Sequence, residues 1–483
     1  QEPAFETEMD LWLVARRETL EVDARDASIA AVARWWLRWC DDRARERESI
    51  GGLVKAFRRF EERGRLELGT SAATHAYLPL LSRDAFVSLQ VQAAVAAHRR
   101  NFGRSPRGFW LPNAAYRPRY EWVPPIGRAN GLGRSLRLGL EEVLAANGLE
   151  WFVVDAHLAG AGEPLSIYRS RFAALAALRG FEERFPQVAP ARTPYETVRV
   201  RSRGAEASAV ALLRDPRTAL QVWSRDEAYP GDPLYLDFNR RKIANGPRYW
   251  RNATAGATEP YDPEAALARV EEHARHFVWL AADTLSRSGE GVLCAPFDAE
   301  LFGHVWFEGP VWIEHVLRHL AAAGTPAIAA SEALTAAPPR ETVSLLEGSW
   351  GEGGDHRAWL NRDTEWTWDR LYDAEGDLAS TLSGMPAGGP TDAPVARAAR
   401  QAVRELLLLQ ASDWQFLITA GVARDYAERR FATHYVEMKR LVELVRRFHG
   451  GNAPTEEEAL YLSVMERRDR LFPELDLAIG GAR

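Results

Sequence analysis

The chain has 483 residues, of which 46% are hydrophobic, 67 are acidic and 61 are basic. A chain of this length can bury a large core in about two to four domains, and its nearly balanced charge offers no field that would attract nucleic acid. It also has no apolar run near the ~20 residues that span a bilayer, and no basic-then-apolar leader opens it. We therefore expect a cytoplasmic protein with no nucleic-acid or membrane partner. Cys40 and Cys294 lie far apart in apolar stretches, which predicts reduced, buried thiols rather than a disulfide framework.

The spacing of apolar residues predicts helices in the first sixty residues, in stretches that include 35–39 and 53–60. Short apolar runs then follow, mostly separated by stretches long enough for a helix. These runs are 66–68, 108–111, 151–154, 210–213 and 291–294. Strands that alternate with helices favour a mainly parallel α/β sheet or barrel.

Most of these runs lead into polar or ring-bearing residues, at 74–75, 112–113, 155–157 and 298–300. In parallel barrels, the carboxyl ends of the strands carry the chemistry. A Pro-, Ala- and Arg-rich stretch near 160–205 predicts a long insertion, which could act as a lid. Beyond Pro338 and Pro339, 3.6-residue apolar spacing at 396–410, 413–430 and 433–448 predicts helices. We therefore expect a barrel domain over 1–335 and a helical C-terminal domain over 336–483.

Several longer segments carry specific motifs. They are ELGTSAATHAYLPLL at 67–81, GFWLPNAAYRP at 108–118, QVWS at 221–224, APFDAELFGH at 295–304, GSWGEGGDHRAWLN at 348–361 and ASDW at 411–414. In this order they resemble the glycogen (1,4-α-glucan) branching enzymes of glycoside hydrolase family 57. The resemblance covers nearly the whole chain. It implies an incomplete seven-stranded (β/α) barrel, a helical C-terminal domain, and an α-glucan groove between them.

The resemblance also assigns a catalytic pair. A retaining glycosyl transfer uses a nucleophile and an acid/base carboxyl group at roughly 5 Å separation. Asp298 occupies the acid/base position, and Asn113 stands where the family has a nucleophilic glutamate. A neutral carboxamide is a poor nucleophile and supplies no charge to an oxocarbenium-like transition state. We therefore expect covalent catalysis to be lost or severely weakened.

Aromatic residues and histidines within or near these motifs are the candidates for glucan binding. They are His75, Trp110, Tyr195, Trp223, His304, Trp350, Trp359 and Trp414. The resemblance places His75 in a donor sugar subsite, Tyr195 on the lid, and Trp223 and Trp414 at the groove. Trp110, Trp223, Trp350 and Trp414 are equally compatible with core packing, and His304 with orienting Asp298.

The family opens with a strand that ends in His-x-His-x-Pro, followed by a second strand. Neither precedes Leu11, and the chain begins with Gln1. Either an upstream piece is omitted or the barrel lacks two strands, which would leave an unpaired edge.

We expect no metal and no cofactor. His273 with His276, and His315 with His319, are paired along the sequence, but neither pair has an evident third ligand or a His-Glu-x-x-His pattern. The glycines at 351–354 lack the strand, helix and lysine of a phosphate-binding loop, so no nucleotide is expected either.

Three functions stay open. The first is a catalytically impaired branching-enzyme-like protein that binds α-glucans such as glycogen, amylose or maltooligosaccharides. The second is an active 1,4-α-glucan branching enzyme in which Glu121 or Glu300 replaces the missing carboxylate. The third is a structural partner of an intact paralogue.

Overall fold

A computed structural model describes most of the chain. The described residues are 3–126, 133–166, 172, 174–175, 178, 192–223, 228–252, 258–289, 291–385 and 393–475. The chain divides into two compact units, each built from two segments. The first unit combines Gln1–Leu68 with Asp215–Ala333, and the second combines Gly69–Arg214 with Leu334–Arg483. The domain boundary expected at residue 335 stays a prediction, because these compact units are not the domains that the sequence suggested.

The second unit contains a six-stranded sheet in the order β1-β2-β5-β7-β6-β8. Its strands are β1 (Thr70–Ser71), β2 (Gly108–Trp110), β5 (Trp151–Asp155), β6 (Val198–Val200), β7 (Ala209–Arg214) and β8 (Thr342–Val343). The four strands from β1 to β7 in this order are parallel, and β6 runs antiparallel to β7. The expected α/β fold is therefore confirmed. The barrel is not, because the sheet formed by the described residues is open, with β1 and β8 at its edges.

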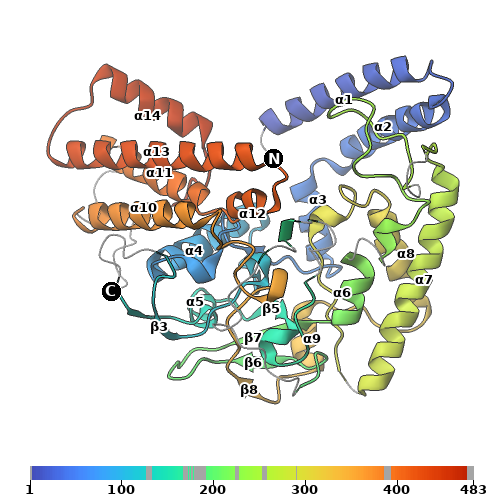
Figure 1. Cartoon of the computed structure of the whole chain (residues 1–483), viewed down its shortest axis with the longest axis horizontal. Coiled ribbons are helices and arrows are strands. Elements are labelled where there is room, and N and C mark those ends of the chain that lie inside the picture. The colour runs from blue at the N-terminus through green and yellow to red at the C-terminus, as the bar shows by residue number, and fades with distance from the viewer. Residues whose placement is uncertain are drawn as a thin grey trace. The chain divides into compact units, whose positions relative to one another are not determined.

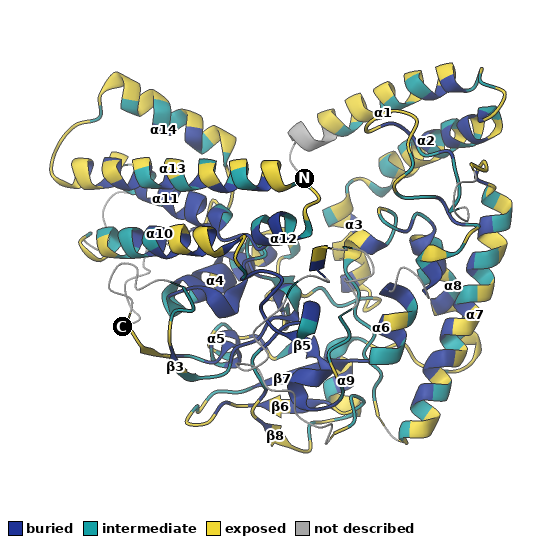
Figure 2. Ribbon diagram, viewed as in Figure 1, coloured by how far each residue is buried: buried dark blue, intermediate teal, exposed yellow. Residues whose placement is uncertain are grey.

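Helices pack on this sheet and continue into a mainly helical C-terminal region (Figure 1). They are α4 (Asp84–Phe102), α5 (Leu140–Ala146), α10 (Glu365–Ser383), α11 (Pro394–Leu409), α12 (Asp413–Ala420), α13 (Arg424–His449) and α14 (Glu456–Arg468). A small antiparallel ribbon pairs β3 (Tyr120–Trp122) with β4 (Ser135–Arg137). Helix α11 is buried along most of its length, whereas α13 buries one face and exposes the other (Figure 2). The two helices therefore form the core of the C-terminal region.

The first unit is helical in its described residues. Its helices are α1 (Pro3–Asp23), α2 (Ala30–Ile50), α3 (Leu53–Glu62), α6 (Pro216–Trp223), α7 (Pro263–Ser288), α8 (Gly309–Ala322) and most of α9 (Ala330–Ala336). Helix α7 begins where the Asp262 side chain accepts hydrogen bonds from the Glu264 and Ala265 amides, which satisfies two free donors of the first turn.

Two sequence expectations for the first unit were wrong. The run 291–294 forms no strand beyond an isolated bridge position at Cys294, whose carbonyl accepts the Asp215 amide over 2.8 Å. Cys40 is buried as predicted, but Cys294 is only half-buried. Among the described residues, no helix is long and apolar enough to cross a membrane. Residues 167–171, 173, 176–177 and 179–191 of the expected lid near 160–205 lie outside the described residues.

Candidate functional site

The carboxyl ends of the central strands lead directly into the motif residues. Strand β2 ends at Trp110, and the one-turn helix η2 (Pro112–Ala114) carries Asn113. The Ser71 hydroxyl at the end of β1 donates to the Trp110 carbonyl over 2.8 Å, which holds the two strand ends together. The His75 loop and Asn113 therefore both lie at the carboxyl ends of the parallel strands, where functional residues are expected.

Asn113 is hydrogen-bonded to two other motif segments at these strand ends. Its Nδ2 donates to the Ser412 hydroxyl over 3.0 Å, and its carbonyl accepts the Trp350 amide over 3.2 Å. The Ser412 hydroxyl donates in turn to the His75 carbonyl over 2.7 Å. Four motif segments that are far apart in the sequence therefore meet around one neutral amide and one hydroxyl.

The backbone at this point is unusual. Asn113 has φ 59° and His75 has φ 54°, both in the left-handed region. Few residues other than glycine adopt this conformation, although asparagine tolerates it better than most. Such strain persists only where the surroundings enforce it, and it is enriched at functional sites. Both left-handed residues therefore lie in motif loops at the ends of parallel strands.

Trp110 and Trp350 contact each other beside Asn113. Their ring centroids are 5.5 Å apart at an angle of 67°, and the Arg214 guanidinium lies 5.1 Å from the centre of the Trp350 ring. Trp350 is buried, whereas Trp110 is half-buried. Of the two rings, Trp110 has more surface with which to stack on a sugar.

Trp359 is only 1% exposed. Its ring stacks on Tyr77 at 4.5 Å, and the Tyr77 hydroxyl lies 2.8 Å from His356 Nδ1. His356 Nε2 lies 3.0 Å from a Glu347 carboxylate oxygen. These contacts favour core packing for Trp359, and its expected role in glucan binding stays a prediction.

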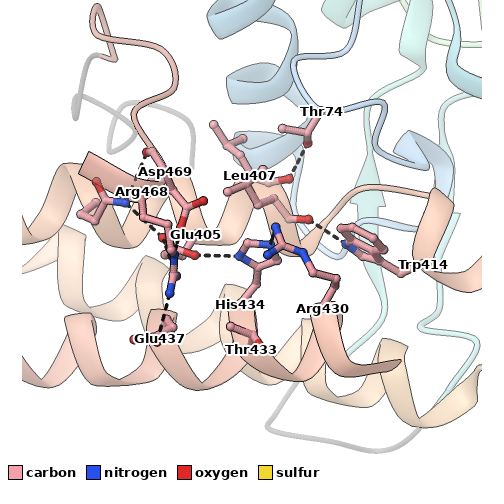
Figure 3. A network of polar contacts seen from close by, with 12 residues as sticks. Thr74, Glu405, Leu407, Trp414, Arg430, Thr433, His434, Glu437, Arg468 and Asp469 are labelled. Atoms are coloured by element: carbon pink, nitrogen blue, oxygen red, sulfur yellow. Dashed lines mark hydrogen bonds and ion pairs between the residues drawn. The ribbon is translucent and has the colours of Figure 1, made fainter. Parts of the chain in front are cut away.

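Trp414 is half-buried on α12, next to a buried polar network (Figure 3). Its indole Nε1 donates to the Leu408 carbonyl over 2.8 Å, and its ring lies 6.2 Å from that of His434. His434 is held between the Glu405 carboxylate, 2.7 Å from Nδ1, and Arg430, 3.0 Å from Nε2. The network fixes the ring behind Trp414, and with it the position of this side chain.

A buried ion pair lies at the ends of the two central strands. Arg214, at the end of β7, contacts both carboxylate oxygens of Asp155, at the end of β5, over 2.7 and 3.2 Å. Burial alone would raise the pKa of Asp155, but Arg214 and His157 outweigh it and hold this pKa below its usual value. The Asp155 carboxylate is therefore charged and already paired with a guanidinium.

His157 connects this ion pair to the Gly-rich loop. Its Nε2 lies 3.1 Å from the Gly354 carbonyl. Gly354 has φ +75°, and a Cβ there would come within 2.6 Å of His157 Nε2. The glycine is required at this position because only a residue without a side chain fits the turn and the close approach.

The other predicted site residues have separate local surroundings. Asp298 is half-buried in the first unit, directly before η7 (Ala299–Leu301), and its carbonyl accepts the Leu301 amide over 3.2 Å. His304 is exposed, with its ring 5.1 Å from that of Phe238. Trp223 is buried at the end of α6. Tyr195 is half-buried in the second unit, shortly before β6. Their catalytic and binding roles stay predictions.

Comparison with known proteins agrees with this architecture. Residues 9–237 match the model of glycosyl hydrolase family 57, and residues 371–479 match that of the 1,4-alpha-glucan branching enzyme C-terminal region. The crystal structure of TK1436, a GH57 branching enzyme from Thermococcus kodakaraensis, aligns with a TM-score of 0.88 at 32% identity. The alignment covers 100% of this chain and 84% of that one. The chain belongs to glycoside hydrolase family 57.

Two further solved structures are also similar. The GH57-type branching enzyme of Pyrococcus horikoshii aligns with a TM-score of 0.86 at 32% identity, over 100% of this chain and 84% of that one. The alpha-amylase AmyC from Thermotoga maritima aligns with a TM-score of 0.75 at 25% identity, over 99% and 86%. In sequence, TK1436 is 37% identical over 97% of this chain and 66% of the relative, so the chain spans slightly less than two thirds of that protein.

In this family 57 chain, sequence reasoning missed two members of the site. Arg214 directly follows the strand expected at 210–213, but nothing in the sequence indicates that it pairs with Asp155. Ser412 lies in the ASDW motif, where the tryptophan was the expected functional residue. Its hydroxyl is the group that links Asn113 to the His75 loop.

Proposed function

We propose that this family 57 chain is a branching-enzyme-like protein that binds α-glucan and is catalytically impaired at Asn113. The substrate class follows from the branching-enzyme relatives, which share its fold and most of its length. Asn113 carries the second part of the proposal. It lies at the end of β2 with its amide hydrogen-bonded to the neutral Ser412 hydroxyl.

A neutral amide at this position removes two functions at once. It does not form the glycosyl-enzyme, and it supplies no negative charge to the oxocarbenium-like transition state. Asp298 alone would keep the acid/base role, which has no covalent intermediate to act on. Stacking of sugar rings on aromatic side chains needs neither group, so binding persists without turnover.

The active-enzyme alternative requires another carboxylate near the sugar carbon. Glu121 is exposed on β3, where it pairs with Arg134 over 3.3 Å, and Glu300 is exposed on η7. No contact of either side chain favours a catalytic role, so we retain impairment as the proposal.

Affinity electrophoresis of the purified chain in amylose gels tests the binding. We expect retarded migration of the parent and weaker retardation of Trp110→Ala. Trp279→Ala is the matched control, because this tryptophan is exposed on α7 and lies outside the motifs. Absence of any retardation, or equal retardation of both variants, would contradict a glucan site beside Asn113. Absence of retardation would also favour the structural-partner alternative.

A further inference from the structure

Helices α7 and α8 bring together three side chains that the proposed function does not use. Glu271 projects from α7, and His315 and His319 project from α8. His315 Nδ1 is hydrogen-bonded to Glu271 Oε2, and His319 Nε2 lies 3.0 Å from Glu271 Oε1. One nitrogen of each histidine and one carboxylate oxygen all lie within 4.8 Å of one another.

The spacing of the two histidines suits a metal. They are four residues apart on one helix, so their rings lie one above the other on the same face. Glu271 precedes His315 by 44 residues and supplies a third ligand atom from the neighbouring helix. This third ligand is what the sequence did not reveal, because nothing in the chain order indicates that α7 packs its Glu271 against this face of α8.

The ligand types match zinc. Zinc takes imidazole nitrogen and carboxylate oxygen at about 2.0–2.2 Å in a tetrahedron, often with three protein ligands and a water. Tetrahedral ligand atoms at that bond length are about 3.4 Å apart, so a contraction of at most about 1.4 Å is needed here. The three side chains are 28–30% exposed, which leaves them room to make this adjustment and leaves the fourth position open to water.

One neighbouring cation competes for the carboxylate. Arg275 Nη2 lies 2.6 Å from Glu271 Oε1, but its side chain is 64% exposed and can turn into solvent. Besides Arg275, both histidines lie within hydrogen-bond distance of the Glu271 carboxylate. A divalent ion would therefore replace an exposed guanidinium as the partner of a charged ligand.

We propose that Glu271, His315 and His319 form a binding site for Zn²⁺ that links α7 to α8. First-row ions that favour imidazole, such as Ni²⁺ and Cu²⁺, are expected to compete at this site, whereas the oxygen-seeking ions Mg²⁺ and Ca²⁺ are not. The site is independent of the proposed glucan function, because all three ligands lie outside the motif segments.

Isothermal titration of the chelator-treated full chain with Zn²⁺ tests the proposal. We expect one ion per chain. His319→Ala and Glu271→Gln should each weaken binding by more than about tenfold, since even the loss of outer-shell partners costs about 10–100-fold. Glu314→Gln is the matched control, because this exposed acid on the same helix pairs with Arg318 and lies outside the cluster.

Thermal unfolding gives a second readout. The midpoint of the parent should rise with Zn²⁺ concentration, because an ion that binds the folded state stabilises it by mass action. The midpoint of Glu271→Gln, which keeps a side chain of the same shape, should not rise. Zinc affinity equal to that of the parent in both ligand variants, or no stoichiometric zinc binding by the parent, would overturn the proposal.

Discussion

The single buried carboxyl group of Glu308 should make the free energy of unfolding depend on pH. It is buried directly before α8, its Oε1 accepts the Leu236 amide over 3.0 Å, and it lines a cavity of about 500 Å³ in the first unit. Burial raises its pKa to about 7, despite opposing hydrogen bonds from Tyr261 and the Leu236 amide. An unfolded glutamate has a pKa of about 4.3. The folded state therefore binds the proton more tightly.

The sign of the effect follows from this difference. Between pH ~4.3 and pH ~7 the folded state holds more protons than the unfolded one, so the free energy of unfolding falls as the pH rises and is level above pH ~7. The pKa difference corresponds to about 4 kcal/mol. Glu308→Gln keeps the hydrogen-bond acceptor but does not ionise, so this fall should be absent.

Urea unfolding at pH 5 and pH 8 measures this prediction. The parent should lose more stability than Glu308→Gln between the two pH values, whereas the exposed control Glu314→Gln should follow the parent. Parallel pH profiles for the parent and Glu308→Gln would show that Glu308 is not held protonated by burial.

Among the elements, the central strands were predictable and the edges were not. The runs at 108–111, 151–154 and 210–213 became β2, β5 and β7, because buried parallel strands are short continuous apolar runs. Strand β1 begins at Thr70, two residues beyond the run expected at 66–68. Strands β6 and β8 are three and two residues long, too short for an apolar pattern to mark them.

The helical region was predicted in outline, but its internal boundaries were misplaced: the break expected between 430 and 433 is absent, because α13 runs unbroken from Arg424 to His449. Residues 413–430 were expected to form one helix, but α12 ends at Ala420 and α13 begins at Arg424. Gly421 adopts φ 69° and caps α12 through a hydrogen bond from its amide to the Leu417 carbonyl. A glycine in the left-handed conformation commonly ends a helix. Because apolar residues keep a near-helical spacing on both sides of Gly421, the sequence pattern did not reveal the break between α12 and α13.

Trp223, the last residue of α6, is expected to contribute to stability. The sequence suggested a sugar platform or a core residue, and this side chain is only 6% exposed. Trp223→Ala should therefore lower the free energy of unfolding by about 3–5 kcal/mol, as expected for a buried tryptophan. The exposed Trp279→Ala should change it little. Unchanged stability of Trp223→Ala together with weaker glucan binding would show that the ring serves as a platform instead.

In the whole molecule, the proposed catalytic pair is divided between the two units. Asn113 belongs to the second unit and Asp298 to the first. The resemblance of the motifs indicated both positions; in the structure Asn113 lies within the one-turn helix η2, and Asp298 directly precedes η7. The links among Asn113, Ser412 and His75 were not predictable, because they join residues about 300 positions apart through side-chain geometry that no local pattern encodes.

In our proposal, Asn113 impairs an otherwise branching-enzyme-like site. Asn113→Glu restores a carboxylate at the end of β2, while Asn113→Gln matches its length without charge. Because the family opens with two strands that the sequence before Leu11 does not show, each variant is compared with and without the N-terminal segment of a longer relative. Asp298→Asn in the Asn113→Glu background removes the expected acid/base.

The most direct measurement is branching of amylose, followed by iodine staining and by chain-length analysis after debranching. We predict background activity for the parent and for Asn113→Gln, measurable branching for Asn113→Glu joined to the N-terminal segment, and loss of that branching with Asp298→Asn. If the parent chain already branches amylose as fast as the Asn113→Glu variant, and Asp298→Asn abolishes that activity, then Asn113 does not occupy the nucleophile position and the account is wrong.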